Sequence, residues 1–375
     1  MTDKRLDALD GLRGVAILLV MGFHYFYHLE SAYYKSHLYP YGETFAGIPL
    51  FQYGYLGVEL FFIISGFVIA LTLEKSSSPL EFLLRRFVRI WPALLFSAVV
   101  TFFLLNWSDA PFALTRRQMW PNFLPSLTLT PTMLWSGAFP NVDFVTGVYW
   151  SLVVEIRFYL IAAILFWGLS GKNFARNLTI FALLDCCIWF LLRLVSPHGG
   201  ELYDTALVPE FMPWFAAGAL FYELYQNRIS QQLAFAMLVA VFIPICITST
   251  HYAIISRNPV VASAIALLFI ATFWLLVARD GQINVLQSKP LVWIGECSYS
   301  IYLFHYAVGM ILISSISKSI GVPAQVLLAL GASLLVLIVG RLSFRLVENP
   351  SRRFLTKLLI NRTPKPITPV PASAS

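Results

Sequence analysis

An arginine and a histidine in the first apolar segment, Arg13 and His24, have a spacing that could serve a reaction. They stand eleven residues apart within residues 11–29. In an α-helix, eleven residues return the chain to within roughly 20° of its starting direction and advance it by about 16 Å. A guanidinium binds anions, and an imidazole moves protons near neutral pH. We therefore expect one helical face to carry both groups at two depths.

The composition indicates a polytopic membrane protein. Hydrophobic residues make up 58% of the chain and charged residues 12%, and the mean hydropathy is +0.73. Soluble domains carry about 25% charged residues. We predict an all-α protein of ten transmembrane helices, each near the ~20 residues that a bilayer requires. The predicted spans are residues 12–29, 50–73, 90–106, 149–169, 177–195, 209–225, 232–250, 259–279, 293–315 and 323–346.

The distribution of basic residues predicts the orientation of these spans. Cytoplasmic loops retain an excess of Lys and Arg. In the predicted topology one side holds only Lys35, Arg116, Arg117, Arg257 and Lys318, and the other side holds most of the remaining basic residues. Both termini are therefore expected in the cytoplasm. Topology also explains the net charge of +7, so we expect no nucleic-acid partner.

Four further expectations concern the organisation of the chain and its metal content. The apolar segment 119–135 is interrupted by Pro121, Pro125 and Pro131, which predicts an outer loop, re-entrant or at the surface, rather than a span. We expect one membrane domain over residues 1–350, with the motif VENP ending the tenth helix. Residues 351–375 are basic and then Pro-rich, which predicts a cytoplasmic tail that is disordered at its end. No Cys-x-x-Cys pair occurs, so no metal is expected.

Four titratable side chains from four predicted spans are expected at similar depths. His24 falls in the outer half of the first span, and Glu59 lies somewhat outside the midplane in the second. Glu155 is about six residues into the fourth span, and His305 follows Tyr302 by one turn in the ninth. Ionisable groups inside a membrane are costly and usually functional. The sequence therefore indicates a reaction site among these helices.

Basic residues are expected at the opposite, cytoplasmic ends of the spans, where guanidinium groups suit phosphate recognition. The run RRFVRIW places three arginines within little more than one helical turn. A phosphorylated ligand held there could extend its far end toward His24. Acyl-coenzyme A has this form, with phosphates at one end and a thioester at the tip of a slender arm. The expected cluster comprises Asp10, Arg13, Arg85, Arg86, Arg89 and Arg353.

With these motifs the chain resembles the acyltransferase-3 membrane family, which includes polysaccharide O-acetylases, nodulation-factor acetylases and some macrolide acylases. The resemblance covers nearly the whole chain, and its hallmark is Arg-x10-His, here Arg13 and His24. Six segments appear in order: RLDALDGLRGVAILLVMGFHYFYH, GYLGVELFFIISGFVI, FLLRRFVRIWPALL, VYWSLVVEIRFYL, WIGECSYSIYLFHY and LVENPSRRFL.

The resemblance implies roles for particular residues. It implies that His24 is catalytic and that Arg13, Arg86 and Arg89 act in catalysis or coenzyme A binding. The family usually has Asp at the position of Glu59, so this chain reaches one methylene further. Many members add an extracytoplasmic SGNH-type domain. This chain ends after the last predicted span and its tail, so transfer is expected from the membrane domain alone or with a partner.

We therefore predict a membrane O-acyltransferase of the bacterial inner membrane. It would move an acyl group, most simply acetyl, from cytoplasmic acyl-coenzyme A to a hydroxyl of a carbohydrate, a lipid-linked glycan or another envelope acceptor. His24 would be a general base or a transient acyl carrier. Glu155 would orient its imidazole, and Arg13 would anchor phosphate or offset negative charge.

Other interpretations remain open at this point. A secondary transporter or lipid-linked sugar flippase would also have about ten spans with ionisable residues near the midplane. A membrane scaffold or sensor is a third possibility. The arginines of RRFVRIW could serve topology alone, and Glu59 and Glu155 could pair with a buried cation such as Arg157. His24 could be a hydrogen-bonded interface residue, and Tyr302 and His305 could belong to an aromatic belt.

Overall fold

The computed structural model describes residues 3–30, 36–196, 203–204, 207–251, 258–278 and 283–360, and the regular secondary structure of these residues is helical. These residues contain no strand. The longer helices are α1 (Asp3–Phe26), α3 (Gly57–Glu74), α4 (Pro79–Trp107), α8 (Trp150–Leu165), α9 (Phe174–Val195), α11 (Met212–Tyr225), α12 (Gln231–His251), α13 (Pro259–Ala278), α14 (Lys289–Glu296), α15 (Ser298–Ser314), α16 (Val322–Ser343) and α17 (Asn349–Leu355). Short helices α2 (Pro49–Gln52), α5 (Pro111–Leu114), α6 (Phe123–Thr128) and α7 (Met133–Ser136) lie in connections.

The prediction of an all-α polytopic membrane protein is confirmed. Among the described residues, eight helices are long and apolar enough to cross a membrane, and the bent pair α14 and α15 would make a ninth. The sixth predicted span corresponds to α11, which has only 14 residues. Its residues from Met212 through Leu224 are all buried, and it contacts α3, α9, α12 and α13. A helix enclosed by protein need not match the bilayer thickness, which accounts for its length.

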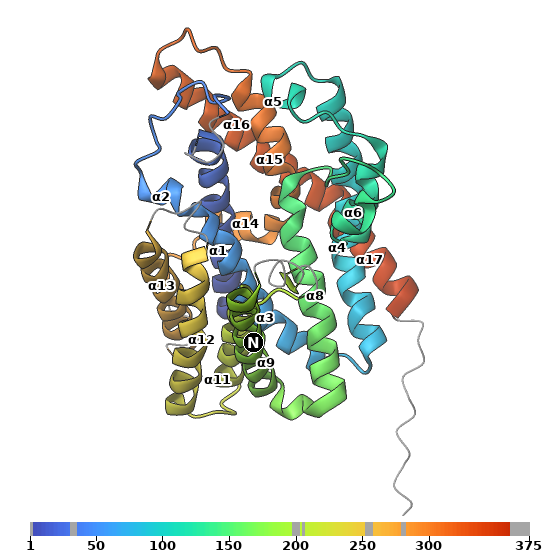
Figure 1. The fold of residues 1–375 in the computed structure, drawn as a ribbon, viewed down its shortest axis with the longest axis vertical. Coiled ribbons are helices and arrows are strands. Elements are labelled where there is room, and N and C mark those ends of the chain that lie inside the picture. Colours follow the sequence, from blue (N-terminus) through green and yellow to red (C-terminus); the bar gives the residue numbers. More distant parts are fainter. Residues whose placement is uncertain are drawn as a thin grey trace, which may run out of the picture.

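The helices form two groups around α1 and α3 (Figure 1). Helices α9, α11, α12 and α13 contact one another, and α11 packs along α3. Helix α15 packs against α16, α4 and α1 on the other side. Helix α8 contacts both α3 and α4. Helices α1, α3, α4, α8 and α15 are therefore the elements that can surround a shared interior.

Helix α1 is held by backbone contacts on two sides. A Cβ added at Gly11 would lie 1.7 Å from the Leu286 carbonyl oxygen, and one added at Gly295 of α14 would lie 1.7 Å from the Asp10 carbonyl oxygen. At the start of α3, a Cβ at Gly57 would lie 2.4 Å from the Ala16 carbonyl oxygen. Only glycine permits approaches this close. The axial position of α1 relative to α14 and α3 is consequently fixed.

The ninth span departs from the prediction of one straight helix. It consists of α14 and α15, which meet at the buried Cys297 with a bend of 77°. Helix α14 turns aside because it packs against the first turns of α1. The third span begins earlier than predicted, because Ser78 caps α4 and Pro79 occupies its first turn, where proline is tolerated. The run RRFVRIW therefore lies inside α4.

The prediction that VENP ends the tenth helix is wrong. The chain stays helical through a π-helical segment Phe344–Glu348, α17 and a second π-helical segment Thr356–Ile360, and this extension packs against α4. Pro350 falls in the first turn of α17, where its missing N–H disturbs little. The basic start of the predicted tail is thus helical, and residues 361–375 lie outside the described residues. Residues 119–135 form short turns and no span, as predicted.

The contact between α3 and α11 leads to a stability prediction. A Cβ added at Gly66 would lie 2.1 Å from the Phe215 carbonyl oxygen, so Gly66→Ala must separate the two helices. We expect a loss of about 1–3 kcal/mol, seen as a lower thermal unfolding midpoint in detergent. Gly331→Ala in α16 is the matched control, because nothing lies within 4 Å of its Cβ position. Equal midpoints for the two variants would contradict the close packing.

Candidate active site

Two cavities lie along α1, each lined by several helices. The histidine cavity encloses about 380 Å³, and its lining includes Phe23, His24, His28, Glu59, Arg116, Thr146, Trp150, Tyr302 and Tyr306. The arginine cavity encloses about 80 Å³, and its lining includes Arg13, Ser65, Arg86, Arg89, Glu155, Tyr299 and Tyr302. Arg13 and His24 thus open into different cavities, as expected for one helical face at two depths.

The two cavities meet at a pair of shared residues. Val58 in the first turn of α3 and Tyr302 in α15 line both. The Tyr302 hydroxyl donates to the Val148 carbonyl oxygen at 2.9 Å, and its oxygen lies 2.7 Å from Ser151 Oγ. These bonds tie the boundary to the start of α8. A slender molecule passing between the cavities would pass these two side chains.

Aromatic hydroxyls fix the end of α1 that carries His24. Tyr39 donates to the His24 carbonyl oxygen, and Tyr41 donates to the Tyr25 carbonyl oxygen. The Tyr25 hydroxyl in turn donates to the His305 carbonyl oxygen at 2.8 Å. The last carbonyl oxygens of a helix have no hydrogen-bond donor within the helix. The hydroxyls of Tyr39 and Tyr41 act as donors to two of these oxygens. His24 therefore stands on a rigid helix end that is bonded to α15.

The neighbours of His24 determine which ring nitrogen carries its proton. Nδ1 lies 2.9 Å from the Val20 carbonyl oxygen and 3.3 Å from Nε2 of His305. A carbonyl only accepts, so the neutral ring carries its hydrogen on Nδ1. His305 is arranged likewise, with Nδ1 2.6 Å from the Tyr302 carbonyl oxygen and Nε2 left to accept. The Nε2 atom of His24 consequently keeps its lone pair.

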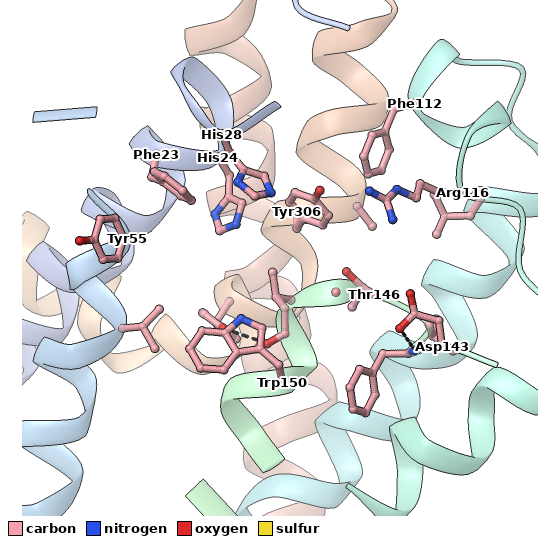
Figure 2. Close-up of a pocket in the computed structure, with 18 of the residues that line it drawn as sticks. Phe23, His24, His28, Tyr55, Phe112, Arg116, Asp143, Thr146, Trp150 and Tyr306 are labelled. Carbon is pink, nitrogen blue, oxygen red and sulfur yellow. Dashed lines mark hydrogen bonds between the residues drawn. The ribbon is translucent and has the colours of Figure 1, made fainter. Parts of the chain in front are cut away.

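The histidine cavity has polar groups on several sides (Figure 2). The rings of His28 and Tyr306 lie 5.1 and 4.9 Å from the ring of His24. Trp150 lies across the cavity from them, and the guanidinium of Arg116 points inward. The described residues include no group of three or more side chains suited to a metal ion. The arrangement suits proton transfer and the binding of a polar molecule.

The arginine cavity carries a surplus of positive charge. Arg86 is 9% exposed, donates to Thr72 Oγ1 at 3.3 Å and lies 5.8 Å from the centroid of the Tyr159 ring. Arg89 faces the same space, and Arg13 enters it while paired with Asp10. Glu155 is the acidic residue of the lining. An anionic or strongly dipolar ligand would be favoured there.

Two sequence-based placements need correction. Glu155 does not lie beside His24, because it lines the arginine cavity, where it accepts hydrogen bonds from Ser65 Oγ at 3.0 Å and from Tyr159. Helix α8 begins at Trp150, which lines the histidine cavity. Glu155 stands five residues later, about 7.5 Å further along the helix and away from that cavity. Arg85 does not line either cavity, because it pairs with Glu81 of its own helix at 2.5 Å. Glu59 and His305 do lie at the His24 end.

Several lining residues were missed at the sequence level. Tyr299, Tyr302 and Tyr306 recur at intervals of three and four, the spacing of one helical face, so the first and last could have been found from the second. Tyr159 lines neither cavity, but it donates to Glu155, which precedes it by four residues on the same helical face. Ser65 and Arg116 carry no such signal. Their positions depend on how α3 and the segment after α5 pack.

Comparison with known proteins decides the family. A family model described as an acyltransferase domain matches residues 6–341. The chain belongs to the acyltransferase-3 family. This membership agrees with a multi-pass protein of the bacterial plasma membrane and favours the acyltransferase prediction over the transporter and scaffold alternatives.

Relatives within the family are similar along most of this chain. O-acetyltransferase OatA of Staphylococcus aureus is 23% identical over 93% of the chain and 58% of its own length. Peptidoglycan O-acetyltransferase OatA of Listeria monocytogenes is 25% identical over 93% and 56%. The putative peptidoglycan O-acetyltransferase YrhL of Bacillus subtilis is 25% identical over 93% and 55%. The chain therefore spans less than three fifths of these acyltransferase-3 relatives. No solved structure matches it.

Proposed function

We propose that the protein transfers an acyl group, most simply acetyl, from cytoplasmic acyl-coenzyme A to a hydroxyl of an envelope glycan. The observation that carries this proposal is that the two cavities share a wall formed by Val58 and Tyr302. One cavity is cationic, and the other presents a histidine nitrogen with a free lone pair. The names of the relatives, peptidoglycan O-acetyltransferases, support a polysaccharide acceptor.

The donor is proposed to enter from the arginine end. The arginine cavity encloses about 80 Å³, which is too small for a nucleotide, so only the slender pantetheine arm would enter it. The buried Arg86 and the partly buried Arg89 line this cavity and would offer charge-assisted hydrogen bonds to the phosphate end of the arm. The excess of basic residues on the predicted cytoplasmic side supports this direction. The thioester would then reach the histidine cavity past Val58 and Tyr302.

Two chemical routes fit the ring geometry of His24. In the direct route, Nε2 takes the hydroxyl proton as the acceptor oxygen attacks the thioester carbonyl, the C–S bond breaks, and the imidazolium returns the proton to the thiolate. In the stepwise route, Nε2 attacks the carbonyl, the C–S bond breaks and coenzyme A leaves as its thiolate. The acyl-imidazolium then acylates the hydroxyl, the N–acyl bond breaks, and the hydroxyl proton passes to the released Nε2. In both routes Nδ1–H stays bonded to Val20 and faces His305, which stabilises the positively charged ring.

Replacing His24 by Asn tests the catalytic role directly. Asn has no basic nitrogen, so transfer of labelled acetyl from acetyl-coenzyme A to solubilised peptidoglycan should fall by about 10²–10⁴-fold. The assay uses the purified chain in nanodiscs. His37→Asn is the matched control, because His37 is exposed and lines neither cavity. Retained transfer by the His24 variant, with an unchanged unfolding midpoint, would exclude His24 as base or acyl carrier.

The arginines of α4 offer an internally controlled test of donor binding. Arg86→Gln and Arg89→Gln should each raise the KM for acetyl-coenzyme A by roughly 10- to 100-fold, because each removes a charged hydrogen-bond donor. Arg85→Gln makes the same change one residue away on a side chain that pairs with Glu81, and it should leave that KM unchanged. Equal KM values for acetyl-coenzyme A in all three variants would contradict donor binding by Arg86 and Arg89 and would leave these arginines a role in topology alone.

His305 is expected to act through His24 as a positioning residue. His305→Leu removes the acceptor opposite Nδ1, so kcat should fall about 10-fold while the KM values of both substrates stay constant. His305→Gln restores an acceptor and should recover part of kcat. Steady-state kinetics with both substrates varied separates these outcomes. A rise in either KM without a change in kcat would contradict a positioning role.

A further inference from the structure

Two side chains that line the histidine cavity, Glu59 and Thr146, each carry a buried polar atom with no hydrogen-bond partner among the described residues. These atoms are Oε2 of Glu59 and Oγ1 of Thr146. Glu59 is 4% exposed and stands in the first turn of α3, whereas Thr146 is 5% exposed and precedes α8. Buried polar atoms without partners destabilise a fold, so few persist in native proteins. Two of them on one cavity indicate partners supplied by a ligand.

The ion-pair interpretation of Glu59 finds no support in the geometry. Arg157, the buried cation considered as its partner, donates instead to the Asp204 carbonyl oxygen at 3.1 Å. Arg157 and Asp204 line a separate cavity that does not include Glu59. Oε2 of Glu59 has no partner among the described residues, so a ligand that reached it from the histidine cavity could supply one.

The remaining wall of this cavity is aromatic. Trp150 is 39% exposed and lies across the cavity from His24 (Figure 2). Tyr55 and Phe211 also line the space. An indole offers an apolar face with little conformational freedom to lose. A pyranose ring matches this wall, because its C–H face is apolar while its edge carries adjacent hydroxyls. The volume of about 380 Å³ lies within the range of small-molecule sites, about 300–1,000 Å³.

We propose that Glu59, Thr146 and Trp150 form an acceptor subsite that binds one pyranose ring of the glycan. Trp150 supports the apolar face of the ring. Glu59 and Thr146 hydrogen-bond two ring substituents that flank the hydroxyl presented to His24. This assignment rests on the proposed acyl transfer and adds the residues that would bind the acceptor sugar. A simple aliphatic alcohol would leave both polar atoms unpaired, so the subsite selects sugars.

Isosteric apolar replacements test the subsite. Glu59→Met and Thr146→Val should each raise the Kd for muramidase-solubilised peptidoglycan by roughly 10- to 100-fold, measured by calorimetry with the chain in nanodiscs. Glu59→Gln keeps hydrogen-bonding atoms and should recover most of the affinity. Glu43→Met, at an exposed position outside the cavity, is the matched control and should bind as the wild type does.

A stability readout separates ligand binding from a structural role. Because Oε2 and Oγ1 have no partner in the described protein, Glu59→Met and Thr146→Val should unfold at the wild-type temperature or above it. Unchanged glycan affinity in both variants, or a lowered unfolding temperature for Glu59→Met, would overturn the subsite. Wild-type glycan binding that depends on these residues, without any acetyl transfer, would instead refute the proposed function and leave the subsite standing.

Discussion

The whole arrangement depends on the backbone contact of α1 with α14 and α3. Gly11, Gly57 and Gly295 allow main chains to touch where any side chain would clash, so α1 cannot slide along its neighbours. Arg13 and His24 are separated by about 16 Å of rigid helix. The helix itself therefore sets the distance between the residue proposed to bind an anion and the residue proposed to react, and the contacts of the helix fix where both stand.

A fixed distance has a chemical consequence when the ligand is itself elongated. Val58 and Tyr302 border both cavities, so the cationic space and the histidine space are neighbours rather than separate sites. Binding energy from phosphates at one end can then hold a thioester at the other, which raises its effective concentration at His24. The hydrogen bonds of Nδ1 to Val20 and of Tyr39 to the His24 carbonyl oxygen maintain the ring geometry that such delivery requires.

Properties of single helices were predictable from the sequence, and properties of helix contacts were not. The register of Arg13 with His24 follows from helical periodicity alone, and counting residues along a span placed Glu59 and His305 correctly. Counting placed Glu155 wrongly, because α8 starts near the wall of the histidine cavity and its next turn already reaches the arginine cavity. Arg85 and Arg86 are adjacent in sequence, and only the packing of α4 shows that they face different surroundings. No proline marks the bend at Cys297, so the sequence did not predict it.

The most direct test is a cryo-electron microscopy structure with S-acetonyl-coenzyme A, an unreactive thioether analogue of the donor. The account predicts that its phosphates lie near Arg86 and Arg89 and that its arm passes Val58 and Tyr302. Its carbonyl should stand within about 3.5 Å of Nε2 of His24. An analogue whose carbonyl remains in the arginine cavity, or which binds elsewhere, would contradict a continuous path from the arginine end to His24.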